Sequence, residues 1–361
     1  MKILLINPGL PHTQPQLEFM VEAGVEVHCL NIRSDFKLER PGIVNYDWFG
    51  REEVNSDLSK LAYFKMGLRA RGFIRALKPD IVHAHYATSA GLIAWLSGYR
   101  PYAVTIHGSD LLERSKTATG RAILRRVLRG AQLVNPVAKH MTVLLRRWGV
   151  REDRTLVMPF GIDLSKLPFV PKANRLAGSV NLLCTRAMDG SVYDLPTLLH
   201  ALAKARSQGS PATLTLAATG PLEPSLKELA GQLGIAQAVT FGGGYTLADL
   251  PALMARHDVY VSSSLSDGAS VSLMEAMACG AFPLVSDIPA NREWLVDGQN
   301  ALLFPPGDRE GLAQLILSLP KRREFVEQAV QSNRALAEAR ADRTKNLRTL
   351  LDRLAATADA H

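Results

Sequence analysis

The pattern that most restricts the fold is an alternation of short apolar runs with helix-like segments along almost the whole chain. Short, nearly continuous apolar runs are typical of strands that are buried on both faces. Helices between such strands favour covered parallel sheets, which is the α/β class of fold. The expected strands are Ile3–Ile6, Val25–Leu30, Ile81–His83, Ala103–Ile106, Val180–Cys184, Thr213–Ala217, Val239–Phe241, Val259–Val261 and Phe282–Val285. The expected helices are Pro15–Ala23, Arg69–Leu77, Ala87–Ser97, Arg121–Arg129, Leu195–Arg206, Ser225–Leu233, Leu247–Met254 and Ser272–Ala278.

The length of the chain indicates two domains. A domain usually holds roughly 100–200 residues, and this chain has 361. The stretch Leu164–Gly178 has prolines, basic residues and no clear period, so it is the expected break. We predict an N-terminal domain over 1–165, a C-terminal domain over 166–340 and a charged helical tail over 341–361 that could pack back on the N-terminal domain. Ligands of open α/β sheets lie outside the carboxyl ends of the strands, so a ligand is expected in a cleft between the domains.

Composition limits the compartment and the chemistry. No apolar run approaches the ~20 residues that span a bilayer. The start at Met1–Leu5 is apolar, but Asn7–Gly9 interrupts it before a signal peptide could form. The three cysteines lie far apart and without zinc-type spacing, which fits a reducing compartment. We therefore expect a cytoplasmic protein with no metal site and no resident cofactor.

The basic charge of the chain is concentrated in one region. The net charge is +8, and between Tyr99 and Thr155 twelve Lys or Arg residues stand against four acidic ones. Such an excess of basic residues most often lies on a solvated helical face. The alternative explanation is that these residues bind an anionic ligand or a membrane surface. Without aromatic residues between the basic ones or an RNA-module motif, charge alone does not favour nucleic-acid binding.

The stretch from Val259 to Asp308 carries the strongest functional signal. A buried strand leads into a loop rich in Ser and Gly, and a helix begins near Ala269–Ser272. The first N–H groups of a helix have no intrahelical acceptor, so this helix start could hold a pyrophosphate. Glu275, on the first turns of the helix, could accept hydrogen bonds from a ribose diol. Taken alone, both features are also common in a capped, solvated helix.

The order of residues in this stretch points to a known family. Asp267 is followed after seven residues by Glu275 and then by Ala-Met-Ala-Cys-Gly. This resembles the signature of the retaining glycosyltransferases of family four, which have the GT-B fold of two Rossmann-like domains facing across a cleft. Further matching segments are Asp80–Tyr86, Thr105–Asp110, Pro159–Asp163, Pro283, Glu293, Val296–Gly298, Asn300 and Pro305–Asp308.

The resemblance implies roles for residues of the C-terminal half. Glu275 would bind the ribose and Asp267 would approach the donor sugar. Backbone N–H groups near Ser270 and Val271 would contact the phosphates or the sugar, and Gly268 belongs to the same donor-binding loop. The family usually has Glu and Gly where this chain has Asp267 and Ser270, and the shorter Asp has less reach.

Arg186 is the expected partner of the diphosphate. It follows an expected strand, where the family places an Arg, and the planar fork of Arg suits phosphate. The family also has a Lys five residues later, but this chain has Ser191 there, with Tyr193 nearby. Half of the cationic clamp is therefore missing.

The N-terminal half is expected to bind the acceptor. The resemblance places His107 at the cleft near the sugar, whereas His83 and His85 are expected to be structural. The family often has a Gly-Gly pair in the loop after the first strand. In this chain the loop is Asn7–Thr13 and holds only Gly9, which is the expected donor contact there.

The resemblance implies a glycosyltransferase that moves a sugar from a UDP-, GDP- or ADP-linked donor to a glycan or lipid-linked acceptor, with retention. His107, Asp267 and Arg186 are the expected catalytic residues. The chain has no Asp-x-Asp motif, so metal independence is expected. The mixed basic and apolar helix at Ala122–Arg129 could rest on an anionic membrane at the inner face. The alternatives are an inactive nucleotide-sugar-binding protein, an epimerase or phosphorylase of similar build, and a nucleic-acid binder suggested only by charge.

Overall fold

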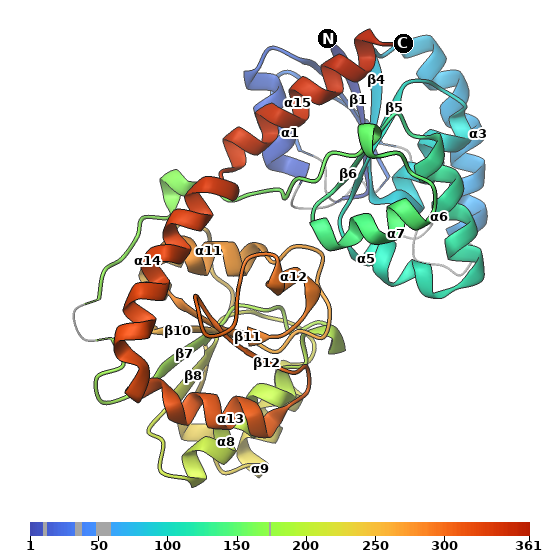
Figure 1. Cartoon of the computed structure of the whole chain (residues 1–361). Coiled ribbons are helices and arrows are strands. Elements are labelled where there is room, and N and C mark those ends of the chain that lie inside the picture. Colours follow the sequence, from blue (N-terminus) through green and yellow to red (C-terminus); the bar gives the residue numbers. More distant parts are fainter. Residues whose placement is uncertain (10–12, 33–37, 48–58, 173–174) are drawn as a thin grey trace. The chain divides into compact units, whose positions relative to one another are not determined.

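The chain forms two compact units (Figure 1). The computed structural model describes the chain except residues 10–12, 33–37, 48–58 and 173–174. Unit 1 comprises Met1–Phe160 with Thr344–His361, and unit 2 comprises Gly161–Arg343. The division after Phe160 precedes the stretch Leu164–Gly178 in which the sequence placed the break. The reason is that Ile162 and Leu167 are buried in the core of unit 2.

Unit 1 contains a six-stranded sheet in which every pair of neighbours is parallel. The order β3-β2-β1-β4-β5-β6 means that the chain first builds outward on one side of β1 and then crosses to the other side. This doubly wound order places its switch point between β1 and β4. The strands are β1 (Lys2–Asn7), β2 (Glu26–Asn31), β3 (Ile43–Asp47), β4 (Ile81–His85), β5 (Tyr102–Ile106) and β6 (Leu133–Pro136).

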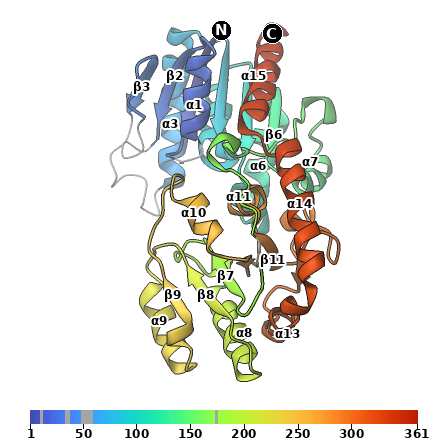
Figure 2. The same cartoon turned by 90° about the vertical axis from the view of Figure 1, so that its left-hand side faces the viewer.

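Helices cover both faces of this sheet (Figures 1 and 2). On one face, Leu17 of α1 and Leu350 and Leu354 of α15 share a core with Ile3 and Leu5 of β1. On the other, α3, α4 and α6 pack against one another. The last helix of the chain is therefore part of the core of unit 1. The helices are α1 (Thr13–Glu22), α3 (Ser59–Leu77), α4 (Gly91–Ser97), α5 (Ser109–Leu112), α6 (Ala118–Gly130), α7 (Thr142–Arg147) and α15 (Arg343–Asp359), with a π-helical turn at Tyr86–Ala90.

Unit 2 repeats the same architecture. Its sheet is also parallel and has the order β12-β11-β10-β7-β8-β9, with the switch point between β7 and β10. The strands are β7 (Asn181–Cys184), β8 (Thr213–Leu216), β9 (Val239–Phe241), β10 (Val259–Ser262), β11 (Phe282–Ser286) and β12 (Leu302–Phe304).

Two hydrophobic cores fill the two faces of the sheet of unit 2. Helices α8, α9 and α13 pack on one face, and α10 and α11 pack on the other. Helix α14 reaches both cores, with Val326 and Val330 in the first and Ala337 in the second. The helices are α8 (Leu195–Ser207), α9 (Glu223–Gln232), α10 (Leu250–Ala255), α11 (Val271–Cys279), α12 (Pro289–Arg292), α13 (Arg309–Ser318) and α14 (Arg323–Arg340).

The first and the last residues of unit 2 lie side by side and are hydrogen-bonded to each other. Ile162 N donates to Ala341 O (2.7 Å), and Arg343 N donates to Ile162 O (3.0 Å). Gly161 has a φ of +73°, and a Cβ there would lie 2.7 Å from Ala341 O. A glycine is required at this position, because both the backbone conformation and the close approach exclude a side chain.

The predicted α/β class and the alternation of elements are confirmed. The sequence missed three strands, β3, β6 and β12, and all three lie at sheet edges. An edge strand has neighbours on one side only, so it needs no continuous apolar run, and Pro136 is tolerated in β6 for the same reason. Within the described residues, no helix combines the length and the apolar character needed to cross a membrane.

Candidate functional site

The predicted C-terminal site residues gather at the switch point of the sheet of unit 2. Arg186 follows β7, and the loop with Gly268 and Asp267 follows the neighbouring strand β10. Ligands of open parallel sheets bind at this point, because the connections on its two sides run away from each other and leave a crevice. The fold alone therefore gives this part of unit 2 the character of a binding site.

Arg186 is held by three side chains from the opposite side of the switch point. Its Nη2 donates to Asp267 Oδ2 at 2.5 Å and to Ser270 Oγ at 2.6 Å. Its Nε donates to Ser262 Oγ at 3.3 Å. The Arg186 and Asp267 side chains are only 10% and 16% exposed, so the ion pair is largely withdrawn from water. The structure therefore brings Arg186, Asp267 and Ser270 together, as one cluster.

The turn that follows Arg186 is tied to the same cluster. The guanidinium lies over the Tyr193 ring, 5.3 Å from its centroid. Ser263 Oγ donates to Tyr193 O at 2.9 Å, and Leu265 N donates to the carbonyl of Val192 at 2.8 Å. Ser191, at the start of this turn, is exposed. The position of the missing lysine is thus an open surface position next to the arginine.

The start of α11 supplies backbone donors beside Arg186. Ser270 is the N-cap, and its Oγ accepts from Leu273 N. The N–H groups of Val271 and Ser272 lie in the first turn, before any intrahelical acceptor is available. The positive end of the helix dipole adds to the attraction for an anion. Gly268 is buried in the loop just before this helix.

Glu275 lies one turn into α11. Burial raises the pKa of this carboxyl to about 7, and the nearby Arg343 and Arg186 act in the opposite direction. Among the described residues, no donor forms a hydrogen bond with Glu275. A half-buried carboxylate without protein partners is suited to accept hydrogen bonds from the hydroxyls of a ligand.

The sequence analysis missed Tyr245, which lies near Glu275, and Thr185, which lies near Tyr245. Burial and the Glu275 carboxylate raise the pKa of Tyr245 to about 12. Thr185, buried directly before Arg186, has its hydroxyl close to Tyr245 without a well-aligned hydrogen bond. The available signals were the position of Thr185 at the end of a strand and that of Tyr245 after the glycines at 242–244.

His107 lies in unit 1, at the carboxyl end of β5. Its Nε2 is 3.0 Å from His85 Nδ1, so one of the two nitrogens carries the shared proton. Its ring packs against Tyr86 and Phe160, with centroids 4.9 Å and 4.7 Å away. The ring is only partly buried and therefore keeps some accessible surface.

His83 is a structural residue. Burial lowers its pKa to about 3, so the ring is neutral. The Gln16 amide donates to Nδ1 at 3.0 Å, and Nε2–H donates to Thr105 Oγ1 at 2.8 Å. Both nitrogens are used inside the core, and nothing remains for a ligand.

Asp110 organises the loop that carries His107. Its carboxylate accepts from His107 N (3.1 Å), Gly108 N (2.9 Å) and Ala87 N (2.8 Å). Burial raises its pKa to about 6, although these N–H groups favour the charged form. The carboxylate therefore fixes the connection after β5 to the π-helical turn after β4.

Gly9 follows β1 at the switch point of unit 1. It has a φ of +85°, and its N–H donates to Asn7 Oδ1 at 3.0 Å. Thr13 Oγ1 donates to the same oxygen at 3.1 Å. Residues 10–12 of the predicted loop lie outside the described residues. Gly9 and His107 thus belong to unit 1, whereas the other predicted site residues belong to unit 2.

Comparisons with known proteins agree with this arrangement. Residues 179–321 match the family model "Glycosyl transferases group 1", and residues 14–166 match "Glycosyltransferase Family 4". Together the two matches cover most of both units. The chain belongs to glycosyltransferase family four. The GT-B fold of this family, with two Rossmann-like sheets and a helical C-terminus, is confirmed.

Relatives of this family-four chain are distant in sequence. It is 27% identical over 272 residues to a glycogen synthase of Mycobacterium tuberculosis, which covers 72% of this chain and 64% of the relative. A D-inositol 3-phosphate glycosyltransferase of Geodermatophilus obscurus is 27% identical over 321 residues, which covers 78% of this chain and 68% of the relative. The chain therefore spans just under two thirds of the glycogen synthase.

Solved structures show the same fold over the whole family-four chain. Anabaena HepE in complex with UDP has a TM-score of 0.80 at 20% identity and covers 99% of this chain and 100% of its own. Sucrose-phosphate synthase from Thermosynechococcus elongatus has a TM-score of 0.82 at 18% identity and covers 100% of both chains. At these identities the likeness establishes the fold and not the ligand.

Proposed function

We propose that this chain transfers a sugar, with retention, from a nucleotide-diphosphate sugar to a hydroxyl of a glycan or lipid-linked acceptor. The observation that carries the proposal is the cluster at the switch point of unit 2. There, a partly accessible guanidinium lies beside the first N–H groups of α11. One turn further along α11 is the Glu275 carboxyl group, which accepts no hydrogen bond from the part of the chain that the structure describes. The three groups match the diphosphate and ribose of one ligand.

In this proposal each group of the cluster meets one part of the donor. Glu275 accepts hydrogen bonds from the ribose hydroxyls. Arg186 and the N–H groups of Val271 and Ser272 face the diphosphate, whose leaving oxygen gains negative charge as the glycosidic bond breaks. Fixed donors aimed at developing charge stabilise the transition state without reorganisation. The donor can carry UDP, GDP or ADP, because Glu275 meets only the ribose.

We further propose that the reaction needs no metal ion and no resident cofactor. The support is that Arg186 contacts the N-cap of α11, so that a cation and a helix N-terminus lie side by side, and that the sequence has no Asp-x-Asp motif. Transfer is expected to continue unchanged in excess EDTA. Loss of transfer in EDTA, with recovery on addition of Mg²⁺ or Mn²⁺, would contradict metal independence.

On the acceptor side, we propose that His107 contacts the transferred sugar. Support comes from its loop position after β5 and from the fixed backbone that Asp110 provides. Loops above a rigid sheet carry binding residues more often than buried positions do. We propose a donor contact at Gly9, where the backbone can approach a ligand closely.

The test is a ligand screen followed by product analysis. Nucleoside diphosphates and their sugars are screened by thermal shift, since a ligand that binds only the folded state raises the melting temperature. The best donor is then incubated with acceptors, and NMR of the product gives the anomeric configuration. An inverted product would overturn retention, and no binding of any nucleotide would overturn the site.

The same experiment separates the alternatives. A nucleotide-sugar-binding protein without turnover would bind the donor and give neither transfer nor slow hydrolysis. An epimerase would return a donor whose sugar has changed configuration. Three departures from the family pattern motivate the inactive alternative: Ser191 removes the lysine of the cationic clamp, Asp267 is shorter than the usual Glu, and the loop after the first strand holds only Gly9.

We also propose that α6 and α7 of unit 1 rest on an anionic membrane surface. Helix α6 buries Leu124, Val127 and Leu128 and exposes four arginines. The Arg129 side chain lies close to Gly149, two residues after the end of α7, and Arg146 and Arg147 of α7 are exposed as well. The exposed arginines of α6 are Arg121, Arg125, Arg126 and Arg129.

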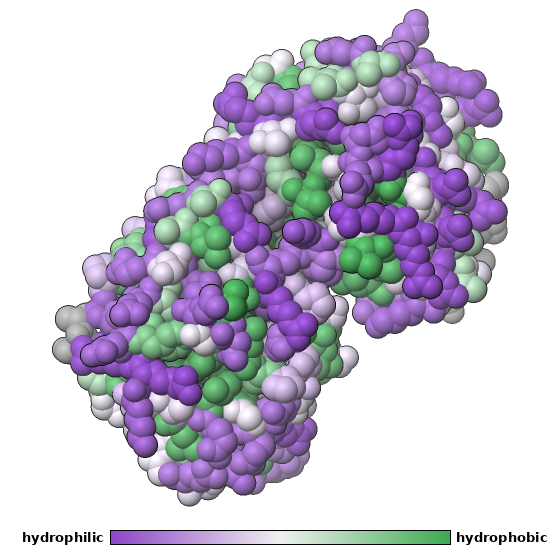
Figure 3. Space-filling model, in the orientation of Figure 1, coloured by the Kyte–Doolittle hydropathy of each residue, from purple (hydrophilic) through white to green (hydrophobic). Residues whose placement is uncertain are grey.

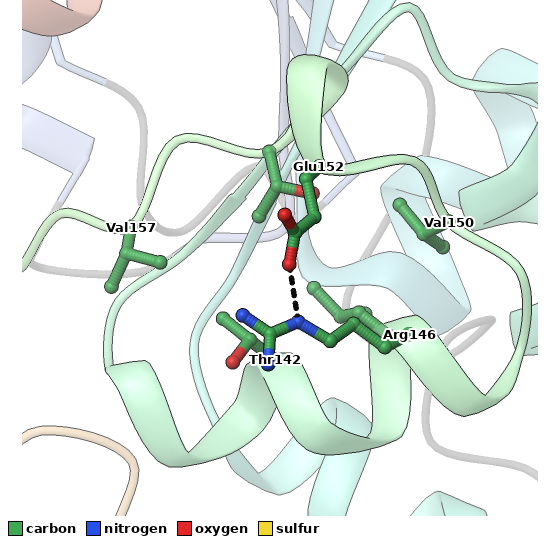
Figure 4. A pocket seen from close by; sticks show the side chains of 7 residues that line it. Thr142, Arg146, Val150, Glu152 and Val157 are labelled. Atoms are coloured by element: carbon green, nitrogen blue, oxygen red, sulfur yellow. Dashed lines mark ion pairs between the residues drawn. The ribbon is translucent and has the colours of Figure 1, made fainter.

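Apolar surface lies within this basic region. Val143 is 66% exposed and Val157 is 41% exposed. Figure 4 shows the adjoining pocket of about 160 Å³, across which Arg146 pairs with Glu152 at 2.7 Å. Figure 3 shows hydrophobic surface in the area of α7 with hydrophilic side chains around it. Apolar groups among cations suit the boundary between lipid headgroups and acyl chains.

A vesicle assay tests the membrane contact. The protein is sedimented with phosphatidylglycerol vesicles and with neutral phosphatidylcholine vesicles, at low and at high salt. Each basic residue near an anionic surface contributes about 1 kcal/mol, so the triple variant R125Q/R126Q/R129Q is expected to lose most binding. The control K321Q/R256Q removes exposed cations of unit 2 and should bind as the wild type does. Failure of the wild type to sediment with anionic vesicles at low salt would rule out the contact.

A further inference from the structure

Tyr193 has a hydroxyl group that the fold of unit 2 does not use. The residue ends the short turn Ser191–Tyr193 in the connection after β7, and its ring packs against the hydrophobic core. Among the described residues, no group forms a hydrogen bond with Tyr193 Oη. The buried side-chain polar atoms that lack a partner do not include this oxygen, so it has surface open to solvent. A phenol can donate one hydrogen bond and accept others, and this one is therefore available to a ligand.

The ring of Tyr193 lies beside the guanidinium of Arg186. The Arg186 Cζ is 5.3 Å from the ring centroid, which is within the range of a cation–π interaction. Burial raises the pKa of the Tyr193 phenol, Arg186 acts in the opposite direction, and Asp267 adds to the rise. The phenol therefore lies within electrostatic reach of both members of the ion pair, and it is protonated at neutral pH. A protonated phenol beside a cation is a suitable hydrogen-bond donor to a phosphate oxygen.

Contacts with the loop after β10 hold the turn that carries Tyr193. Leu265 N donates to Val192 O at 2.8 Å. Ser263 Oγ lies 2.9 Å from Tyr193 O and 2.8 Å from Asp194 O, so its single hydrogen is shared between the two carbonyl groups. The loop after β10 is the same loop that carries Asp267 and leads to the N-cap of α11. The fold therefore fixes the Tyr193 backbone against the candidate site.

Asp194, directly after this turn, has a strained backbone. Its φ of +43° and ψ of +46° lie in the left-handed region, which residues other than glycine adopt only rarely. The Asp194 carboxylate accepts from Thr197 Oγ1 at 2.7 Å, which anchors the residue to the start of α8. Strain of this kind persists only where the surroundings impose it, and it is frequent at functional sites. The strain thus gives a second reason to assign a binding role to the turn.

We propose that Tyr193 binds the donor diphosphate through its hydroxyl group and takes over part of the role of the lysine that the family pattern places at position 191. This inference rests on the proposed function of the same site. Ser191 and Tyr193 belong to one turn, so a donor group from either position can approach the same phosphate oxygens beside Arg186. The phenol adds a directed hydrogen bond but no charge, so the attraction for the diphosphate depends less on salt than that of a two-cation site.

The variant Tyr193→Phe tests the inference, because it removes only the hydroxyl group. The ring keeps its packing and its face toward Arg186, so the variant should fold with a melting temperature close to that of the wild type. UDP, GDP and ADP are titrated into both proteins by calorimetry without acceptor, together with the glucose-linked form of the tightest binder. Loss of one hydrogen bond to a charged oxygen should weaken the nucleoside diphosphate and the nucleotide sugar alike, by about fivefold to tenfold.

Two results of this titration would overturn the inference. Unchanged affinity for both ligands would show that the hydroxyl group does not reach the diphosphate. Weaker binding of the nucleotide sugar alone would show that the hydroxyl group contacts the sugar instead.

Ser191→Lys provides a second test, since it returns the cation whose role the hydroxyl group is proposed to share. In this background, Tyr193→Phe should weaken the nucleoside diphosphate by less than about twofold, because groups that serve the same oxygens are not additive. The double variant should then bind at least as tightly as the wild type. An equal loss in both backgrounds would show that positions 191 and 193 act independently, and it would overturn the shared role.

Tyr99→Phe is the matched control. The Tyr99 hydroxyl group donates to Pro79 O at 2.5 Å in unit 1, and its removal should leave both affinities unchanged. Failure of the inference is distinguishable from failure of the proposed function. A wild type that binds none of the three nucleoside diphosphates contradicts the function, whereas a wild type and a Tyr193→Phe variant that bind equally well contradict only the role of Tyr193.

Discussion

Asp110 of unit 1 and Glu275 of unit 2 are both buried enough to have raised pKa values, but they differ in the hydrogen bonds that their oxygens accept. Burial raises both pKa values, to about 6 and about 7. Asp110 accepts three backbone N–H groups, whereas within the described chain Glu275 accepts none. A raised pKa thus does not distinguish these two carboxyl groups, whereas the number of protein N–H groups that each one accepts does.

The two carboxyl groups also differ in how each relates to the candidate site residues of its own unit. In unit 1 the carboxylate fixes the loop that presents His107, so its effect on a ligand is indirect. In unit 2 the carboxylate lies about one turn after the N-cap of α11, close enough to Arg186 for that guanidinium to oppose the rise of its pKa. The doubly wound sheets are alike, and the difference lies in the loops that follow their strands.

The largest expected effect is the loss of the Asp110 contacts. Asp110→Ala leaves the N–H groups of Ala87, His107 and Gly108 without an acceptor, and each unsatisfied buried group costs about 1–3 kcal/mol. We expect the free energy of unfolding of unit 1 to fall by about 3–5 kcal/mol, measured by urea denaturation. Asp110→Asn keeps one acceptor oxygen and should lose less. Wild-type stability in Asp110→Ala would show that the carboxylate is not structural.

Glu275→Gln should separate stability from binding. Since the pKa of Glu275 is raised when folded, the folded chain holds its proton more tightly than the unfolded chain. The unfolding free energy therefore falls as pH rises from the unfolded pKa to about 7. At pH 8 the variant is expected to be more stable by about 1–3 kcal/mol, with little difference near pH 4. Its nucleoside-diphosphate affinity should fall about tenfold or more. Lower stability at pH 8 would contradict the unpartnered state of Glu275.

Nucleotide binding by the wild type should depend on pH through the same group. With a pKa of about 7, Glu275 is mostly protonated at pH 6 and mostly ionised at pH 8, and only the ionised form uses all its lone pairs as acceptors. Affinity for the nucleoside diphosphate should rise about fivefold to tenfold over this range. The same affinity measurements on Glu275→Gln show how much of the pH dependence comes from protonation of the ligand itself. If affinity changes with pH in the same way in both proteins, Glu275 does not have the proposed role.

The smallest expected effect is that of Ser191→Lys on the affinity for the nucleoside diphosphate. Ser191→Lys restores the cation that the family pattern expects near Arg186, on an exposed turn. The affinity for the nucleoside diphosphate is expected to rise about threefold to fivefold at low salt and less at high salt. Ser207→Lys, at the far end of α8, adds the same charge away from the site and should have no effect. Equal gains in both variants would show that only net charge matters.

Much of the fold followed from the sequence, because buried parallel strands produce apolar runs. The central strands were predicted and the edge strands β3, β6 and β12 were not, since an edge strand is less restricted in composition. The site residues of unit 2 were predicted from motif spacing, and the fold places Arg186, Asp267, Ser270 and Glu275 in one cluster. That placement does not by itself test their roles.

The contacts within the cluster could not be predicted. Nothing in the sequence indicates that Asp267 and Ser270 share one nitrogen of Arg186, because that contact depends on how two loops from neighbouring strands meet. Tyr245 and Thr185 were missed for the same reason. Spacing along a helix fixes which residues share a face, but it does not fix what a long side chain from another strand will bind.

The membership of α15 in unit 1 has a consequence for the order of folding. Leu350 and Leu354 complete the core over β1, yet they are synthesised after all of unit 2. During translation, the part of the apolar core of unit 1 that α15 covers therefore stays exposed until unit 2 has been synthesised. A circular permutant that joins residues 344–361 ahead of Met1 would supply that helix first, and its first unit should reach protease resistance earlier on the ribosome.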